Sequence, residues 1–236
     1  MSPGAKRFHA LGTDDKSVQG LMQAFGRRFG METFISEILA FKFNGNLGAR
    51  KAEIKDGLSK LLADCSSKHS FLRAKAYYSL RYDSDVIFWL MSKEPGEIAK
   101  AKAGIELLLG GVAGVSHGFL SVYRQSRQHE ASEGNRFFVA YPMSKSPEWY
   151  LIDEAERKRI VADHVRVATS SPNNNGISSF TTESFGIGDS EFVVIYELSD
   201  IGKWVAVTEE LRHVEARKWI TNEHPILVGI EGLAYI

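Results

Sequence analysis

Cysteine is nearly absent from the sequence, and neither sign of charge is in excess. Cys65 is the single cysteine among 236 residues, which excludes an intramolecular disulfide and a cysteine metal cluster and is typical of a reducing compartment. Lysine and arginine together number 29, and so do aspartate and glutamate, so a broad basic surface for nucleic acid is not expected. The composition favours a cytoplasmic protein without a nucleic-acid partner.

Long hydrophobic runs are also absent. The sequence contains no uninterrupted apolar stretch of about 18 residues, which a membrane-spanning helix would need, and no signal-peptide core at its start. Residues 1–25 are rich in glycine and charged side chains, and we expect them to form a flexible leader. The remaining chain is long enough for one large domain or two small ones.

The two halves of the sequence show the same order of elements. In the first half, the hydrophobic pattern predicts strands at 31–43, 71–80, 86–90 and 119–124 and helices at 49–65 and 95–109. In the second half, it predicts strands at 137–145, 178–184, 192–198 and from 218 onward, and helices at 153–167 and 201–213. We therefore predict an α+β fold of tandem ferredoxin-like (βαββαβ) repeats, of the dimeric α+β barrel type, with domains at 26–130 and 131–236. The sheet faces that helices leave uncovered should pack face to face.

Two familiar motifs are excluded by their context. Residues 114–118, GVSHG, match the letters of a serine-hydrolase nucleophile elbow, but that motif follows a strand and opens a helix, whereas here a helix precedes and a strand follows. The histidines show none of the paired spacings of a zinc site. Neither serine hydrolysis nor a dedicated zinc centre is expected.

Residues 137–164 carry the strongest candidates for chemistry. Strand alternation places Tyr141 and Lys145 on one face. Asp153 is suited to cap the helix that follows, on whose apolar face His164 lies one turn after Ile160. Structural roles are the alternatives: His164 as a core histidine satisfied by backbone groups, Tyr141 as a packing ring, and Lys145 as a solvated strand end.

Several short segments together resemble the chlorite dismutase superfamily, and in particular its coproheme decarboxylase branch. They are YPMSK at 141–145, WYL at 149–151, the helix that ends at His164, GIGDSEF at 186–192 and LRHVEA at 211–216. The resemblance extends over about residues 76–229 and agrees with the repeat, since that family has two ferredoxin-like halves per subunit. It implies a homopentamer with haem in the C-terminal half.

The resemblance also implies roles for single residues. His164 would be the proximal iron ligand, a role that a neutral imidazole can fill. Tyr141 and Lys145 would be catalytic, the tyrosine by taking hydrogen from a propionate of the porphyrin and the lysine by holding the carboxylate. The remaining positions implied to lie at the cofactor are Trp149, Arg212, Ser179 on the distal side, and Glu215 as acceptor for the second ring nitrogen of His164.

Two positions depart from the family pattern. Ser179 stands where true chlorite dismutases carry a distal arginine, so chlorite decomposition is disfavoured. Arg217 stands where a small hydroxyl residue would contact a propionate. Arg212 and Glu215 also have plain alternatives, as a complement to a helix dipole and as a surface ion-pair partner.

These observations predict a haem-dependent oxidoreductase, namely a coproheme decarboxylase that uses hydrogen peroxide to convert iron coproporphyrin into haem b. A haem peroxidase acting on another substrate is one alternative. A protein that binds or transfers haem without catalysis is a second, and a cofactor-free protein that only oligomerises is a third.

Overall fold

The N-terminal half forms the predicted βαββαβ unit in the computed structural model, which describes residues 32–125 and 134–236. Its elements are β1 (Glu32–Phe43), α2 (Lys51–Ser67), β2 (Phe71–Ser79), β3 (Val86–Ser92), α3 (Pro95–Leu109) and β4 (Ala113–Gln125). β4 begins six residues earlier than the pattern indicated, so the GVSHG segment lies within a strand. The leader predicted for residues 1–25 and most of the junction between the halves lie outside the described residues.

The C-terminal half repeats the unit. Its elements are β5 (Phe137–Lys145), α4 (Glu154–Ser170), β6 (Ile177–Glu183), β7 (Phe192–Leu198), α5 (Ile201–Glu210), β8 (Ile220–Asn222) and β9 (Leu227–Glu231). Asp153 caps α4 as predicted, because its carboxylate accepts hydrogen bonds from the backbone N–H groups of Ala155 at 2.8 Å and Glu156 at 3.4 Å. Asp200 caps α5 in the same way.

The strands of both halves join into one closed barrel. The sheet order is β7-β6-β4-β1-β3-β2-β9-β5-β8, and a further pairing of β7 with β5 closes the ring. Within the ring, β4-β1-β3-β2 and β9-β5-β7-β6 are the same 4-1-3-2 order of a ferredoxin-like sheet. The tandem-repeat α+β barrel prediction is confirmed. The structure adds that the second strand of each half pairs with the last strand of the other.

The seam between β2 and β9 depends on a glycine. Gly229 lies opposite Ser79 of β2 and Phe138 of β5. A Cβ atom at position 229 would stand 2.8 Å from the Tyr77 Cβ and 3.1 Å from the Tyr78 carbonyl oxygen. Only glycine lets β9 approach β2 this closely.

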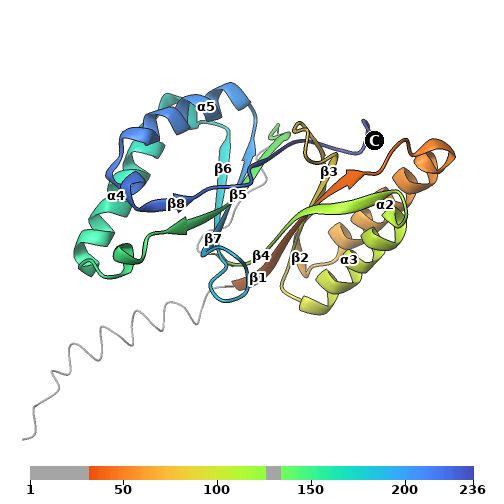
Figure 1. The fold of residues 1–236 in the computed structure, drawn as a ribbon, viewed down its shortest axis with the longest axis horizontal. Helices are drawn as coiled ribbons and strands as arrows, with labels where there is room; N and C mark the ends of the chain where they lie inside the picture. The colour runs from red at the N-terminus through yellow and green to blue at the C-terminus, as the bar shows by residue number, and fades with distance from the viewer. Residues whose placement is uncertain (1–31, 126–133) are drawn as a thin grey trace, which may run out of the picture. The chain divides into compact units, whose positions relative to one another are not determined.

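The barrel interior holds an apolar cluster drawn from both halves, as the face-to-face prediction requires. The buried side chains in it are Phe34, Ile38, Ala40, Tyr77, Ile87, Trp89, Met91, Tyr123, Phe138, Ala140, Phe180, Val193, Ile195 and Leu227. The helices lie outside the strands, with α2 and α3 on one side and α4 and α5 on the other (Figure 1). No helix within 32–125 or 134–236 is long and apolar enough to cross a membrane.

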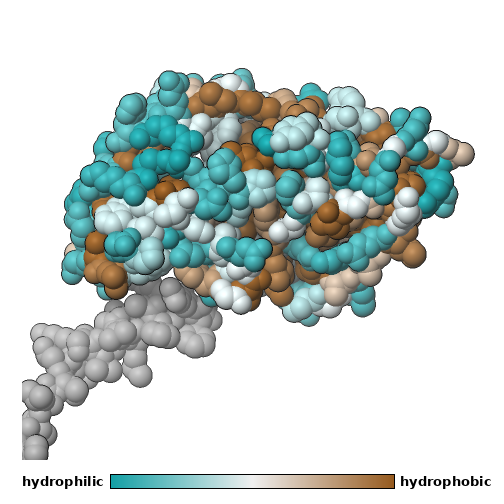
Figure 2. Space-filling view, viewed as in Figure 1, coloured by the Kyte–Doolittle hydropathy of each residue, from teal (hydrophilic) through white to brown (hydrophobic). Residues whose placement is uncertain are grey.

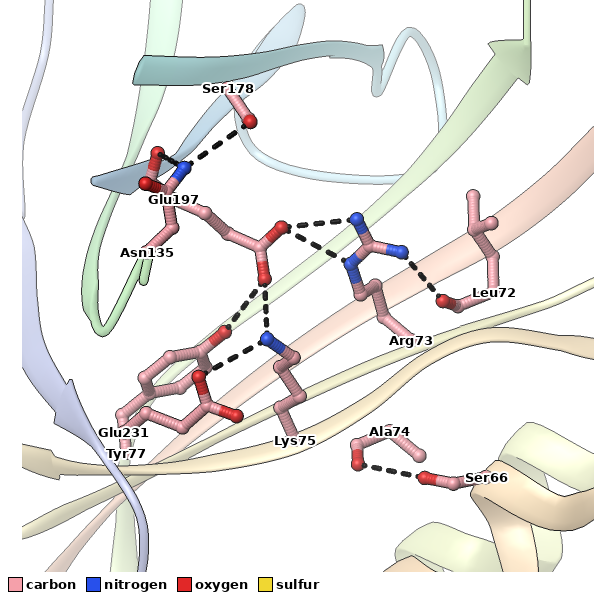
Figure 3. Close-up of polar contacts among 10 residues, drawn as sticks. All are labelled: Ser66, Leu72, Arg73, Ala74, Lys75, Tyr77, Asn135, Ser178, Glu197 and Glu231. Atoms are coloured by element: carbon pink, nitrogen blue, oxygen red, sulfur yellow. Dashed lines mark hydrogen bonds and ion pairs between the residues drawn. The ribbon is translucent and has the colours of Figure 1, made fainter. Parts of the chain in front are cut away.

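A buried charge network also joins the halves inside the barrel (Figure 3). The Glu197 carboxylate on β7 accepts hydrogen bonds from the Arg73 guanidinium at 3.0 and 3.2 Å, lies 2.9 Å from the Lys75 Nζ and receives the Tyr77 hydroxyl at 3.4 Å. Only 4% of the Glu197 side chain and 8% of the Arg73 side chain are exposed. Because the three partners of the Glu197 carboxylate all come from β2, this network ties β7 of one repeat to β2 of the other across the barrel interior.

Candidate functional site

A pocket lies between the outer face of the C-terminal sheet and its helices. Phe138 and Ala140 of β5 are in the barrel core, so the alternate residues Tyr141 and Met143 face the helices, as predicted. The cavity has a volume of about 120 Å³. Its lining residues are Tyr141, Met143, His164, Thr181, Val194, Tyr196, Trp204, Thr208, Leu211, Arg212, Val214, Arg217, Ile220 and Glu223.

His164 on α4 reaches this pocket in its neutral form. The side chain is half-buried, and burial lowers its pKa, as does the nearby charge of Lys145, against a smaller opposing effect of Asp163. No hydrogen bond to either ring nitrogen is formed within the described part of the chain. The imidazole therefore offers a free lone pair at neutral pH.

A pair of tyrosines forms the wall across from the helices. The Tyr141 and Tyr196 rings are stacked, with centroids 6.2 Å apart and planes at 28°. Burial raises the pKa of the Tyr141 phenol well above its usual value, and the adjoining Tyr196 hydroxyl raises it further. Ser179 on β6 contacts the same Tyr196 hydroxyl, so three hydroxyl groups meet at this wall and Tyr141 keeps its proton at neutral pH.

Lys145 and Trp149 form a pair beside the pocket. The Lys145 ammonium lies 4.2 Å from the centre of the Trp149 ring, a cation–π contact. Burial lowers the pKa of Lys145, and the carboxylates of Glu191 and Glu223 oppose that change. Trp149 is itself buried in η2 (Pro147–Tyr150), where it packs with Ile160 of α4. Neither side chain lines the cavity, but the charge of Lys145 acts on His164.

Arginines and a glutamate occupy the mouth of the pocket. Arg212 lies in η4 (Leu211–His213) and Arg217 in η5 (Glu215–Trp219). The Glu223 Oε2 atom accepts hydrogen bonds from both guanidinium groups, at 3.3 Å from the Arg212 Nη1 and closer to the Arg217 Nη1. The Glu223 side chain is only 17% exposed. Two cations are therefore gathered at this edge, and they share the single negative charge of Glu223.

Glu215 does not hold His164 in the structure. Its carboxylate lies 2.5 Å from the Arg159 guanidinium and 3.5 Å from the Lys218 ammonium, and no hydrogen bond joins it to the imidazole. The Arg159 guanidinium on α4 pairs with Glu215 and with Glu156 at the same time. The surface ion pair, which was the alternative for this residue, is what is observed.

The structure thus brings Tyr141, His164 and Arg212 to one cavity, with Ser179 behind the tyrosines and Lys145 with Trp149 at the side. Sequence reasoning missed Tyr196 and Glu223. Tyr196 alternates with the buried Glu197 along β7, so its place on the outer face could have been read from the strand period. Glu223 lies in a turn after β8, and no pattern indicated its position.

Comparisons with known proteins agree with this architecture. The family described as chlorite dismutase matches residues 51–232. Coproheme decarboxylase from Mycolicibacterium smegmatis is 22% identical over 196 residues, which are 78% of this chain and 84% of that protein.

Solved structures share the fold over most of the chain. A crystal structure described provisionally as a chlorite dismutase has 38% sequence identity, a TM-score of 0.78, and coverage of 85% of this chain and 95% of that one. A haem-binding protein from Thermus thermophilus has 16% identity, a TM-score of 0.71, and coverage of 85% and 93%. A mutant chlorite dismutase from Candidatus Nitrospira defluvii has 16% identity, a TM-score of 0.72, and coverage of 84% and 91%. The last two establish the fold alone, whereas the family match spans well over half of the sequence, and the chain therefore belongs to the chlorite dismutase family.

Proposed function

We propose that the protein is a haem-dependent oxidoreductase that uses hydrogen peroxide to decarboxylate iron coproporphyrin, with haem b as the product. The observation that carries the proposal is the meeting of Tyr141, His164 and Arg212 at one cavity. The likeness to a coproheme decarboxylase supports it. The homopentamer and the cytoplasmic location belong to the same proposal, and light scattering of the purified protein would test the assembly.

The donor groups suit an iron porphyrin that carries carboxylates. The neutral His164 imidazole would bind the iron, since its lone pair is not engaged by another group. Arg212, Arg217 and Lys145 would hold propionates by charge-assisted hydrogen bonds. Leu211, Val214 and Ile220 supply apolar wall. The cavity volume of about 120 Å³ is the one property that does not match, because pockets for organic ligands commonly measure about 300–1,000 Å³. Binding of a porphyrin therefore requires the mouth of this pocket to widen.

The reaction balances with one peroxide for each propionate. The side chain –CH₂–CH₂–COOH loses carbon dioxide and two hydrogens to become –CH=CH₂, and the peroxide takes up those two hydrogens and becomes two waters. Iron bound at His164 would supply the oxidising power of peroxide. Tyr141 holds its phenolic proton, so it can give up a hydrogen atom and then recover one from the propionate chain. Lys145 would fix the carboxylate that leaves.

Mass spectrometry tests this function directly. The purified protein is loaded with iron coproporphyrin and treated with hydrogen peroxide, and the porphyrin is then extracted. We expect the loss of two carboxyl groups in the wild type and an unchanged porphyrin in Tyr141→Phe, which keeps the ring but has no hydrogen to give. Tyr82→Phe is the matched control, because Tyr82 is 84% exposed. An unchanged porphyrin mass with the wild-type protein would refute the proposal.

A second candidate is haem binding or transfer without catalysis. The outward face of β6 carries the hydroxyls of Ser179 and Thr181, and neither can hold an anionic reaction partner as an arginine could. In that case the protein would show a shifted Soret band on adding haem, abolished in His164→Ala, but no loss of carboxyl groups with peroxide. A haem peroxidase would instead oxidise a phenolic dye equally well in the wild type and in Tyr141→Phe.

A further inference from the structure

The carboxylate at the pocket mouth stands where a ligand carboxylate would bind. Glu223 is largely buried, and its Oε2 atom is shared by Arg212 and Arg217. Its negative charge adds to the raised pKa of Tyr141 and opposes the lowering of the pKa of Lys145, which places the group inside the electrostatic field of the pocket. A propionate carries the same functional group and would seek the same two guanidiniums.

The turn that carries Glu223 lies at the surface, outside the barrel strands. Glu223 follows β8 directly, and Asn222 closes the turn through hydrogen bonds with the backbone of His224 at 3.2 and 3.4 Å. Asn222 and Glu223 are partly exposed and His224 is exposed. Displacing the carboxylate therefore requires a short surface turn to rearrange, with no loss of barrel strands.

We infer that Glu223 is a specificity-determining residue: its carboxylate occupies Arg212 and Arg217 until a porphyrin carboxylate replaces it. The inference rests on the proposed porphyrin site and deepens it. A ligand without carboxylates cannot neutralise the two guanidiniums that it would separate from Glu223, so it is rejected. A ligand with propionates exchanges one ion pair for another and gains the space that the turn releases.

The experiment compares two porphyrins on two proteins. Iron coproporphyrin carries four propionates, and iron octaethylporphyrin carries ethyl groups instead. Each is titrated into the wild type and Glu223→Gln, with the Soret band as readout. Glutamine keeps the size of the side chain but not the charge, so we expect about tenfold tighter binding of iron coproporphyrin, because the competing state is removed. Iron octaethylporphyrin should bind detectably to neither protein, because its ethyl groups would cover the two guanidiniums without supplying a counter-charge in either.

Three further measurements complete the test. Metal-free coproporphyrin, followed by fluorescence, should show the same tightening without any iron bond. Glu209→Gln on α5 is the matched control, since Glu209 is exposed and outside the pocket, and it should bind both porphyrins as the wild type does. If Glu223→Gln does not fold, Glu223→Asp keeps the charge on a shorter side chain and should show an intermediate gain.

The outcomes separate this inference from the proposed function. Equal affinity of the wild type and Glu223→Gln for coproporphyrin would overturn the inference alone. Equal tightening for both porphyrins would also overturn it, because the gain would then come from space rather than charge. If neither protein binds either porphyrin, the proposed site itself is wrong and the inference fails with it.

Discussion

The two helix layers cover equivalent sheets but pack against them very differently. In the N-terminal half, α2 and α3 bury Ile54, Leu58, Cys65, Ile98, Ala101, Ile105 and Leu109 against the strands. In the C-terminal half, Ile160 is the buried residue of α4 and Val207 that of α5. The same chain order thus yields a solid apolar layer in one copy and a layer with a cavity beneath it in the other.

This difference shows how a duplicated fold can separate stability from function. The N-terminal layer supplies hydrophobic burial without polar side chains that need partners. The C-terminal layer presents His164 and Arg212 to the cavity, opposite Tyr141 of β5, and it leaves Val161, Val165 and Val205 at least 46% exposed. On the visible face, hydrophobic and hydrophilic side chains are mixed over α4 and α5 (Figure 2). Substitutions in the two layers should therefore have opposite consequences.

The largest effect is expected where the halves meet. Glu197→Gln leaves the buried Arg73 guanidinium without its countercharge, so the free energy of unfolding should fall by about 3–5 kcal/mol, as measured by urea denaturation. Glu231→Gln is the control, because Glu231 contacts the same Lys75 but is 39% exposed. Similar small losses in both variants would mean that the network does not bind the repeats together.

A core truncation in the N-terminal layer should come next. Leu58→Ala empties a fully buried position on α2, and we expect a loss of about 3 kcal/mol with porphyrin affinity unchanged. Val165→Ala on α4, a position that is 50% exposed, should change stability by less than about 0.5 kcal/mol. If the two truncations cost the same, the contrast between the layers is wrong.

A smaller change in stability is expected from Tyr141→Phe. Loss of the hydroxyl beside Tyr196 should cost about 1 kcal/mol. Porphyrin binding should persist while decarboxylation disappears. Calorimetry and a Soret titration on the same sample would check both, and failure to bind porphyrin would show that the phenol positions the ligand rather than reacting with it.

The smallest effect concerns pH and His164. The pKa of His164 is lowered in the folded protein from an ordinary value of 6.5. As pH falls, the unfolded chain therefore takes up a proton on this histidine at a higher pH than the folded protein does. The stability that the neutral imidazole provides is present above about pH 6.5 and is lost as pH falls through the lowered folded pKa. Chemical denaturation at about pH 8 and pH 5.5 should therefore show a steeper loss in the wild type than in His164→Gln. Parallel losses of stability in the two proteins would mean that folding does not lower the pKa of His164.

Much of this fold could be predicted because both repeats follow simple periods. Alternation along β5 separated Tyr141 from Phe138, and an aspartate before α4 marked its start. The beginning of β4 was missed because residues 113–118 are rich in glycine and alternate poorly. The site was predicted only in part, since Glu223 reaches Arg212 and Arg217 through a turn whose position depends on tertiary packing. Glu215 pairs with Arg159 of α4, the surface ion pair that the sequence left open as its alternative role.

The closed ring has a consequence for any attempt to divide the chain. Each of the two seams, β2 with β9 and β4 with β6, takes one strand from each repeat. A fragment with residues 134–236 alone would leave β6 and β9 with bare backbone edges, which recruit strands from neighbouring molecules. Such a piece should aggregate or assemble into swapped pairs, so the duplication acts as mutual edge protection that neither copy can give up.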